Sequence, residues 1–358
     1  MSLVNTSANV SPLAKQTTLA LLGTGTVGSA FLSRFARLQK SQNIKHLRLV
    51  QVSNTRHSIR DFLGLDPNVV REDLSQHTPS PLEEITRTLG HAGIIIDATA
   101  SDEVAGWHSR WLASGYKVVT ANKAGTGGNL TAYQIINHQG KNYGDAATVG
   151  AGLPLLRSLR ELRNGGDNIH GIAGILSGSL AWLFNNYDGM RPFSSFVREA
   201  RSLGYTEPDP RIDLSGQDVK RKLLILARTA GYALEADAIQ VESLLPSKLA
   251  NANTLEVDSQ LESLDAPIRA RFLAADRVGR RLRFVARWEQ ARLNQAGQAR
   301  IGLEELDPDD ALANGSGCDN RVAIWSDRYP SNALVIQGPG AGAEVTAAAL
   351  LDDVLRLA

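Results

Sequence analysis

The stretch that decides the fold lies near the N-terminus, where TTLALL at residues 17–22 runs directly into GTGTVG at residues 23–28. The first six residues are typical of a buried strand, and residues 29–38 have the apolar spacing of a helix. A G-x-G-x-x-G turn between a strand and a helix predicts a dinucleotide-binding Rossmann domain. An ordinary glycine-rich turn is the alternative. We expect the cofactor phosphates to contact Gly23, Thr24, Gly25, Thr26, Val27 and Gly28.

The end of the next predicted strand, residues 47–52, bears on the choice of cofactor. An acidic residue at this point would bind the ribose 2′-hydroxyl of NAD. The chain has Ser-Asn-Thr-Arg at residues 53–56 instead, which favours NADP with Arg56 near its 2′-phosphate. The alternative is that Arg56 is a solvated loop residue.

Composition is that of a globular enzyme. The chain has 358 residues and a net charge of +1, so neither nucleic acid nor an anionic membrane is an expected partner. It has no apolar run long enough to span a membrane and no secretory signal, and its single cysteine excludes an internal disulfide. We therefore expect a cytoplasmic protein. Residues 1–16 are small and polar and are expected to be disordered.

Strands and helices alternate over residues 17–147, the predicted nucleotide-binding domain. Thr99 ends a predicted strand at 94–99, and Lys123 follows another at 117–120. Both residues should face the ligand crevice at the carboxyl ends of the strands, although Lys123 could instead be a surface lysine. Residues 148–320 are expected to form an α+β domain with a mixed sheet, and residues 321–358 to return to the first domain.

A charged loop followed by a helix start occupies residues 204–222. Glu207 and Asp213 lie in the loop, whereas Asp218 and Lys222 are one helical turn apart and share a face. Ser215 followed by Asp218 predicts that the helix begins at Ser215, and Gly231 should end it. The plain interpretation of Asp218 and Lys222 is a surface ion pair; the alternative is a reaction centre.

These motifs together resemble the homoserine dehydrogenase family over nearly the whole chain. The matching segments are residues 23–28, 121–123, 148–154, 174–179 and, most specifically, 204–222. The resemblance implies NAD(P)-linked interconversion of L-aspartate 4-semialdehyde and L-homoserine, on the path to threonine and methionine, by a homodimer.

The resemblance also implies roles for individual residues. Lys222 resembles the proton donor, Glu207 and Asp218 resemble substrate ligands with Asp213 near them, and Lys123 resembles a catalytic and cofactor contact. Thr99 and Gly340 fall where the family contacts cofactor or substrate. A sodium or similar ion is implied at backbone carbonyls near Ala146, Val149, Ala151 and Leu153. Ala146 replaces a glutamate that is frequent in the family, with Asp145 one place earlier.

Two other functions remain open at this point. Aspartate-semialdehyde dehydrogenase would need a nucleophilic cysteine, for which Cys318 is the only candidate. A non-catalytic NADP sensor on the same fold would not need the charged residues of the 204–222 segment. The chain resembles the short form of the family, without a C-terminal regulatory domain, and is therefore expected to be insensitive to threonine.

Overall fold

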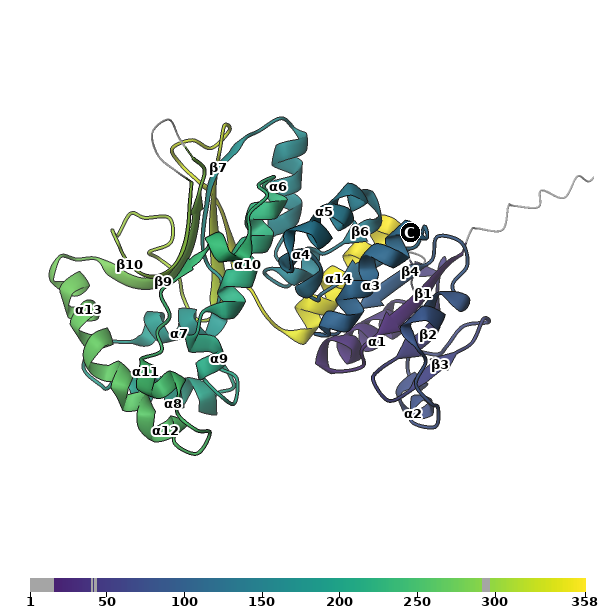
Figure 1. Cartoon of the computed structure of the whole chain (residues 1–358), viewed down its shortest axis with the longest axis horizontal. Coiled ribbons are helices and arrows are strands. Elements are labelled where there is room, and N and C mark those ends of the chain that lie inside the picture. Colours follow the sequence, from purple (N-terminus) through teal and green to yellow (C-terminus); the bar gives the residue numbers. More distant parts are fainter. Residues whose placement is uncertain (1–15, 40, 42–43, 292–296) are drawn as a thin grey trace, which may run out of the picture.

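The computed structural model describes residues 16–39, 41, 44–291 and 297–358. The predicted disordered N-terminus therefore lies, except for Gln16, outside the described residues. The chain forms two units side by side, each built on its own six-stranded sheet (Figure 1). None of the described helices combines the length and apolar character needed to cross a membrane.

The first unit is a Rossmann-type domain. Its sheet has the order β3-β2-β1-β4-β5-β6, and all neighbours are parallel except β2 and β3. The strands are β1 (Thr17–Leu22), β2 (Leu47–Ser53), β3 (Ser58–Arg60), β4 (Ile94–Asp97), β5 (Lys117–Thr120) and β6 (Tyr143–Gly144). The helices are α1 (Thr26–Leu38), α2 (Val70–Leu74), α3 (Asp102–Ala113), α4 (Ala124–Gly127) and α5 (Leu130–His138).

The two faces of this sheet are covered by helices from opposite ends of the chain. On one face α1 packs with α14 (Ala343–Leu357), around buried residues such as Phe31 and Leu350. On the other face α3 packs over Ile95 and Val118. In Figure 1 the yellow α14 lies among the blue and purple elements of this unit, so the chain returns to the nucleotide-binding domain as expected.

The second unit is an α+β domain with the predicted mixed sheet. Its order is β12-β11-β7-β9-β10-β8, antiparallel except between β10 and β8. The strands are β7 (Ile169–Ile175), β8 (Gln240–Val241), β9 (Arg281–Glu289), β10 (Gln298–Leu306), β11 (Asp319–Ser326) and β12 (Leu334–Pro339). The helices are α6 (Leu155–Asn164), α7 (Gly178–Asn186), α8 (Phe193–Ser202), α9 (Arg211–Leu214), α10 (Gln217–Thr229), α11 (Ser247–Ala250), α12 (Val257–Gln260) and α13 (Asp265–Arg277).

The structure corrects the predicted return of the chain at residue 321. Strand β11 pairs with β7 and with β12, so residues 319–339 complete the second sheet. Only α14 belongs to the nucleotide-binding unit. The sequence did not indicate this pairing, because alternation of side chains over a few residues does not reveal which strand will be the partner.

Two helix starts also differ from prediction. Helix α1 begins at Thr26, inside the glycine turn, with Gly25 as its N-cap. Helix α10 begins after Gly216 rather than at Ser215, because the short α9 precedes it and the backbone reverses at Gly216 with φ of +73°. That left-handed conformation favours glycine. The predicted end at Gly231 is confirmed by its φ of +104°.

Candidate active site

The glycine turn between β1 and α1 has no room for side chains at two of its three glycines. A Cβ atom on Gly28 would lie 1.9 Å from the carbonyl oxygen of Gly23, and one on Gly23 would lie 2.9 Å from the carbonyl oxygen of Ala98. A Cβ atom on Gly25, in contrast, would have no neighbour within 4 Å. The turn thus packs α1 tightly against β1 and leaves open space at the N-terminus of α1. Positive helix ends of this kind attract phosphate groups.

Asn54 connects the end of β2 to the glycine turn. Its side-chain Nδ2 donates a hydrogen bond of 3.0 Å to Oγ1 of Thr24, and its Oδ1 accepts from the backbone N–H of Arg56 at 2.9 Å. The exposed Arg56 therefore lies in a turn held beside Thr24. This contact joins residues 30 positions apart, so the sequence pattern did not indicate it.

Thr99 and Lys123 follow β4 and β5, two adjacent parallel strands. The hydroxyl of Thr99 donates a hydrogen bond of 2.6 Å to the buried carboxylate of Asp97. Lys123 extends from the same edge of the sheet, and its ammonium lies 3.4 Å from Asp218 of α10 in the other unit. The two strand ends thus contribute to one edge, as predicted.

The centre of the candidate site is the ion cluster of Lys222, Asp218 and Lys123. The Lys222 ammonium lies 2.8 Å from Oδ2 of Asp218 and donates a hydrogen bond of 2.7 Å to the backbone carbonyl of Leu176. Its side chain is only 10% exposed. The Asp218 side chain is 48% exposed, so the pair joins a buried ammonium to a half-exposed carboxylate. The carbonyl of Leu176 could not be found by pattern reasoning, because the contact joins α10 to the residue that follows β7, 46 positions earlier in the chain.

The two ammonium groups change the protonation of Asp218. Burial by itself would raise the pKa of this carboxyl, but the charges of Lys222 and Lys123 outweigh that effect and lower the pKa to about 2. Asp218 is therefore ionised at neutral pH. A permanently charged carboxylate can hold both lysines in place.

The other two predicted site acids of the 204–222 segment, Asp213 and Glu207, have separate environments. Asp213 accepts hydrogen bonds from the Ser179 hydroxyl at 2.7 Å and from the backbone N–H of Glu207 at 2.9 Å. Both of its oxygens thus hold the loop in place. The Glu207 side chain is exposed, and its carboxylate makes no hydrogen bond within the described ranges. Asp213 shapes the loop, while Glu207 leaves its carboxylate available.

Gly340 lies where the chain leaves β12 for α14. A Cβ atom here would be 2.0 Å from the side chain of Asn320, which is itself buried and lies 3.5 Å from the Leu176 carbonyl. Gly340 therefore permits the last crossing between the units to pass close to the acceptor of Lys222. Asn320 is a second residue near the cluster that the sequence did not indicate.

Of the predicted cation-binding residues, Ala146 begins η4 (Ala146–Thr148), and Val149, Ala151 and Leu153 lie in the turn between η4 and α6. Gly150 and Ala151 both have positive φ, at +76° and +51°. Left-handed backbone is uncommon for alanine, so this turn has a strongly constrained shape. The described ranges contain no group of three or more His, Cys, Asp or Glu side chains that could hold a metal ion.

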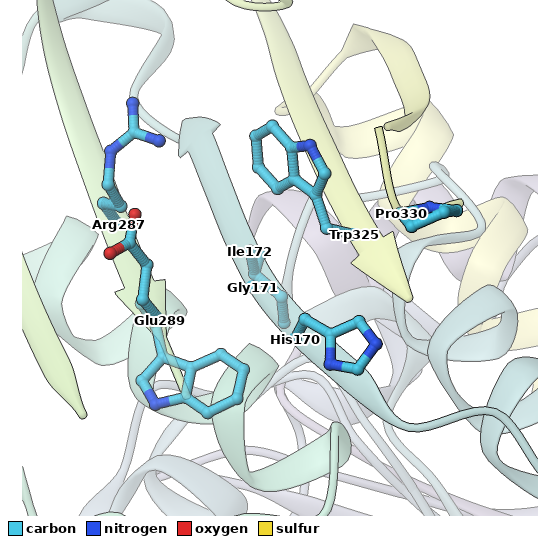
Figure 2. A pocket seen from close by; sticks show the side chains of 8 residues that line it. His170, Gly171, Ile172, Arg287, Glu289, Trp325 and Pro330 are labelled. Carbon is cyan, nitrogen blue, oxygen red and sulfur yellow. The ribbon is translucent and has the colours of Figure 1, made fainter. Parts of the chain in front are cut away.

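A groove of about 500 Å³ lies on the second sheet, lined in part by His170, Arg287, Glu289 and Trp325 (Figure 2). Figure 2 shows these side chains projecting from neighbouring strands of the sheet, among them β9 and β11. None of the predicted site residues lines this groove. It is thus a feature separate from the ion cluster.

Known protein families match the sequence of each of the two units. Residues 23–144 match the family model of the homoserine dehydrogenase NAD-binding domain, and residues 154–355 match the model of homoserine dehydrogenase itself. The chain is 38% identical to bifunctional aspartokinase/homoserine dehydrogenase 2 of Escherichia coli (strain K12) over 96% of its own length and 43% of that relative. It therefore spans less than half the length of this bifunctional relative.

Other relatives are matched nearly end to end. A homoserine dehydrogenase of Emericella nidulans is 34% identical over 95% of this chain and 97% of its own length. A crystal structure of a Candida auris protein of unknown function has a TM-score of 0.86 and 32% identity, covering 96% of this chain and 98% of that one. With both family models matched in order and relatives aligned from end to end, the chain belongs to the homoserine dehydrogenase family.

Proposed function

We propose that the protein catalyses the reversible NAD(P)H-dependent reduction of L-aspartate 4-semialdehyde to L-homoserine, a step toward threonine and methionine. The observation that carries this proposal is the buried Lys222 ammonium beside Asp218, which meets Lys123 from the carboxyl edge of the first sheet. A proton donor and a second cation thus lie where the nucleotide-binding unit faces the second unit.

The residues of the first unit fit a dinucleotide. The open space beside Gly25 and the N-terminus of α1 would receive the pyrophosphate, with Thr24, Thr26 and Val27 around it. The strand β2 ends without an acidic residue, and the exposed Arg56 lies beside Thr24 through Asn54. Both features favour NADP over NAD. Thr99, Lys123 and Gly340 are the further proposed contacts near the reacting end.

The side chains of the protein transfer the proton and orient the substrate. When bound, the nicotinamide supplies or accepts the hydride. An ammonium has three N–H groups, and Lys222 uses two of them on Leu176 and Asp218. The third is available to donate to the aldehyde oxygen as negative charge develops there. In the reverse direction Lys222 accepts the proton of the homoserine hydroxyl.

The substrate ends need groups of opposite charge. The α-ammonium of the substrate suits the available carboxylate of Glu207, with Asp213 fixing the loop that presents it. The α-carboxylate suits Lys123, the more exposed of the two cluster lysines. Asp218 orients both lysines and touches the substrate through its remaining lone pairs.

A monovalent cation such as sodium is proposed at the turn of Ala146, Val149, Ala151 and Leu153. In the described part of the chain no hydrogen bond reaches the carbonyls of Val149 and Ala151, whereas Leu153 accepts one from Leu155 at 2.8 Å. Hard cations bind to such oxygens. The buried Asp145, which precedes this turn, supplies negative charge nearby and is paired with Arg160 at 2.5 Å.

We further propose that the protein is a homodimer that pairs through the groove face of the second sheet. Trp325 lies only partly buried on this face, and Arg287 and Glu304 form an ion pair of 2.8 Å across neighbouring strands. Light scattering should give twice the chain mass, and Trp325→Arg should shift it toward the monomer. A monomeric mass for the unaltered protein contradicts this proposal.

The function is tested by NADPH consumption with and without aspartate semialdehyde. Consumption that requires the semialdehyde is expected, and its absence across pH and salt conditions would leave the non-catalytic sensor as the better interpretation. The alternative of aspartate-semialdehyde dehydrogenase needs a reactive thiolate. Burial raises the pKa of the Cys318 thiol, which disfavours that form.

A further inference from the structure

The carboxylate of Asp97 is fully buried, and of the groups assigned to the reaction in the described ranges it contacts Thr99 alone. A buried charge is costly unless several donors surround it. Five hydrogen bonds converge on this one. Its Oδ1 accepts hydrogen bonds from the backbone N–H of Thr99 at 2.9 Å and from the Thr99 hydroxyl at 2.6 Å. Its Oδ2 accepts from the side-chain amide of Asn122 at 3.0 Å and from the Thr120 hydroxyl at 3.4 Å. The same Oδ2 also contacts Nε2 of His108 at 3.0 Å.

These contacts join the ends of two strands. Thr99 follows β4 and Asn122 follows β5, so one carboxylate fixes both loops at the crevice edge. Asn122 then fixes the residues around it. Its Nδ2 also donates to the Ser101 carbonyl at 2.8 Å, and its Oδ1 accepts from the N–H of Ala124 at 3.0 Å.

Lys123 lies between Asn122 and Ala124, so its backbone is held from both sides. Its ammonium reaches Asp218 across the gap between the units at 3.4 Å. A rotation of the Asn122 turn would move the backbone from which this ammonium extends. A misplacement of about 1 Å near a reaction centre can cost on the order of 100-fold in rate.

We propose that Asp97 is a positioning residue that, through Asn122, sets Lys123 against Asp218. The proposal rests on the proposed function of the cluster. The His108 side of the carboxylate has a different role. His108 is fully buried, contacts the Tyr143 hydroxyl at 2.9 Å and lies against Gly125 of α4. It supplies a control, because it contacts the same carboxylate but makes no hydrogen bond to Asn122, Lys123 or Ala124 within the described ranges.

The experiment compares Asp97→Asn, Asn122→Ala and their combination with His108→Gln. The amide in Asp97→Asn has the same shape as the carboxylate, but its NH₂ group is a donor that faces the donors of the surrounding residues. We therefore expect the Asn122 turn to shift. We expect each of the first two variants to lower kcat/KM for the semialdehyde by at least about 10-fold. The double variant should be no worse than the poorer single one, since both act on one turn. His108→Gln should lower the melting temperature but keep kcat/KM within about threefold.

A second readout does not depend on activity. In protein labelled with ¹⁵N at the lysine side chains, the Lys123 resonance, assigned with Lys123→Arg, should move in Asp97→Asn and Asn122→Ala but not in His108→Gln. An unmoved resonance, or losses that multiply in the double variant, overturns the proposal. If Asp97→Asn does not fold, Asn122→Ala against His108→Gln decides alone. An inactive unaltered protein would instead contradict the proposed function and leave the resonance test in force.

Discussion

Replacing Lys222 with methionine tests the centre of the proposed mechanism. Methionine keeps most of the buried stem, which matters because the side chain is only 10% exposed, and removes the ammonium that contacts Leu176 and Asp218. The third N–H of that ammonium is the one proposed to meet the developing oxyanion. Removing one such donor costs about 2.7–4 kcal/mol, or about 100- to 1,000-fold in kcat.

The assay is NADPH consumption at saturating aspartate semialdehyde, with NADPH binding followed separately by fluorescence. We expect binding of NADPH to persist, because the glycine turn is untouched. Lys220→Ala is the control, since Lys220 lies on the same helix two residues away and outside the cluster. If Lys222→Met retains kcat within about threefold of Lys220→Ala, Lys222 is not the proton donor.

Three further variants test the surrounding groups. Arg56→Ala should weaken NADPH by about tenfold through the loss of a charge-assisted contact and leave NADH nearly unchanged, so equal effects in fluorescence titrations remove Arg56 from the site. Asp218 has a lowered pKa, so its contribution to stability is present above its ordinary range and is lost as pH falls toward about 2. In denaturant titrations the free energy of unfolding should therefore fall less with decreasing pH in Asp218→Asn than in the unaltered protein. The same dependence of this free energy on pH in both proteins would count against the ion cluster. Gly25→Ala should fold normally and lose cofactor affinity because its Cβ enters the open space, whereas Gly28→Ala should lower the melting temperature because its Cβ meets the Gly23 carbonyl. A normal NADPH affinity in Gly25→Ala would mean that the phosphates bind elsewhere.

Sequence reasoning succeeded where the deciding contacts are local. The glycine turn is specified by residues next to one another, and Asp218 and Lys222 share a helix face by their spacing alone. It failed where the backbone conformation, rather than the side-chain pattern, determines where an element begins. Ser215 carries a capping side chain, yet the helix begins only after Gly216, where the left-handed backbone connects α9 to α10.

Contacts between distant segments were beyond prediction for a different reason. The Leu176 carbonyl, Asn320 and Asp97 contribute to the site through groups that have no sequence signature. A backbone carbonyl is present at every residue, and an aspartate at a strand end is common. Their roles follow only from which strands are neighbours, as with β11, whose pairing with β7 brings Asn320 close to the acceptor of Lys222.

The charges of the cluster match the proposed reaction. Two ammonium groups and one ionised carboxylate leave one net positive charge where the two units meet. The substrate brings a carboxylate of its own, and further negative charge develops on its oxygen during hydride transfer. Because Lys123 comes from the first unit and Lys222 from the second, this charge is assembled only when the units hold their present arrangement. Asp218 contacts both lysines, so the arrangement of the units and the proposed chemistry depend on the same carboxylate.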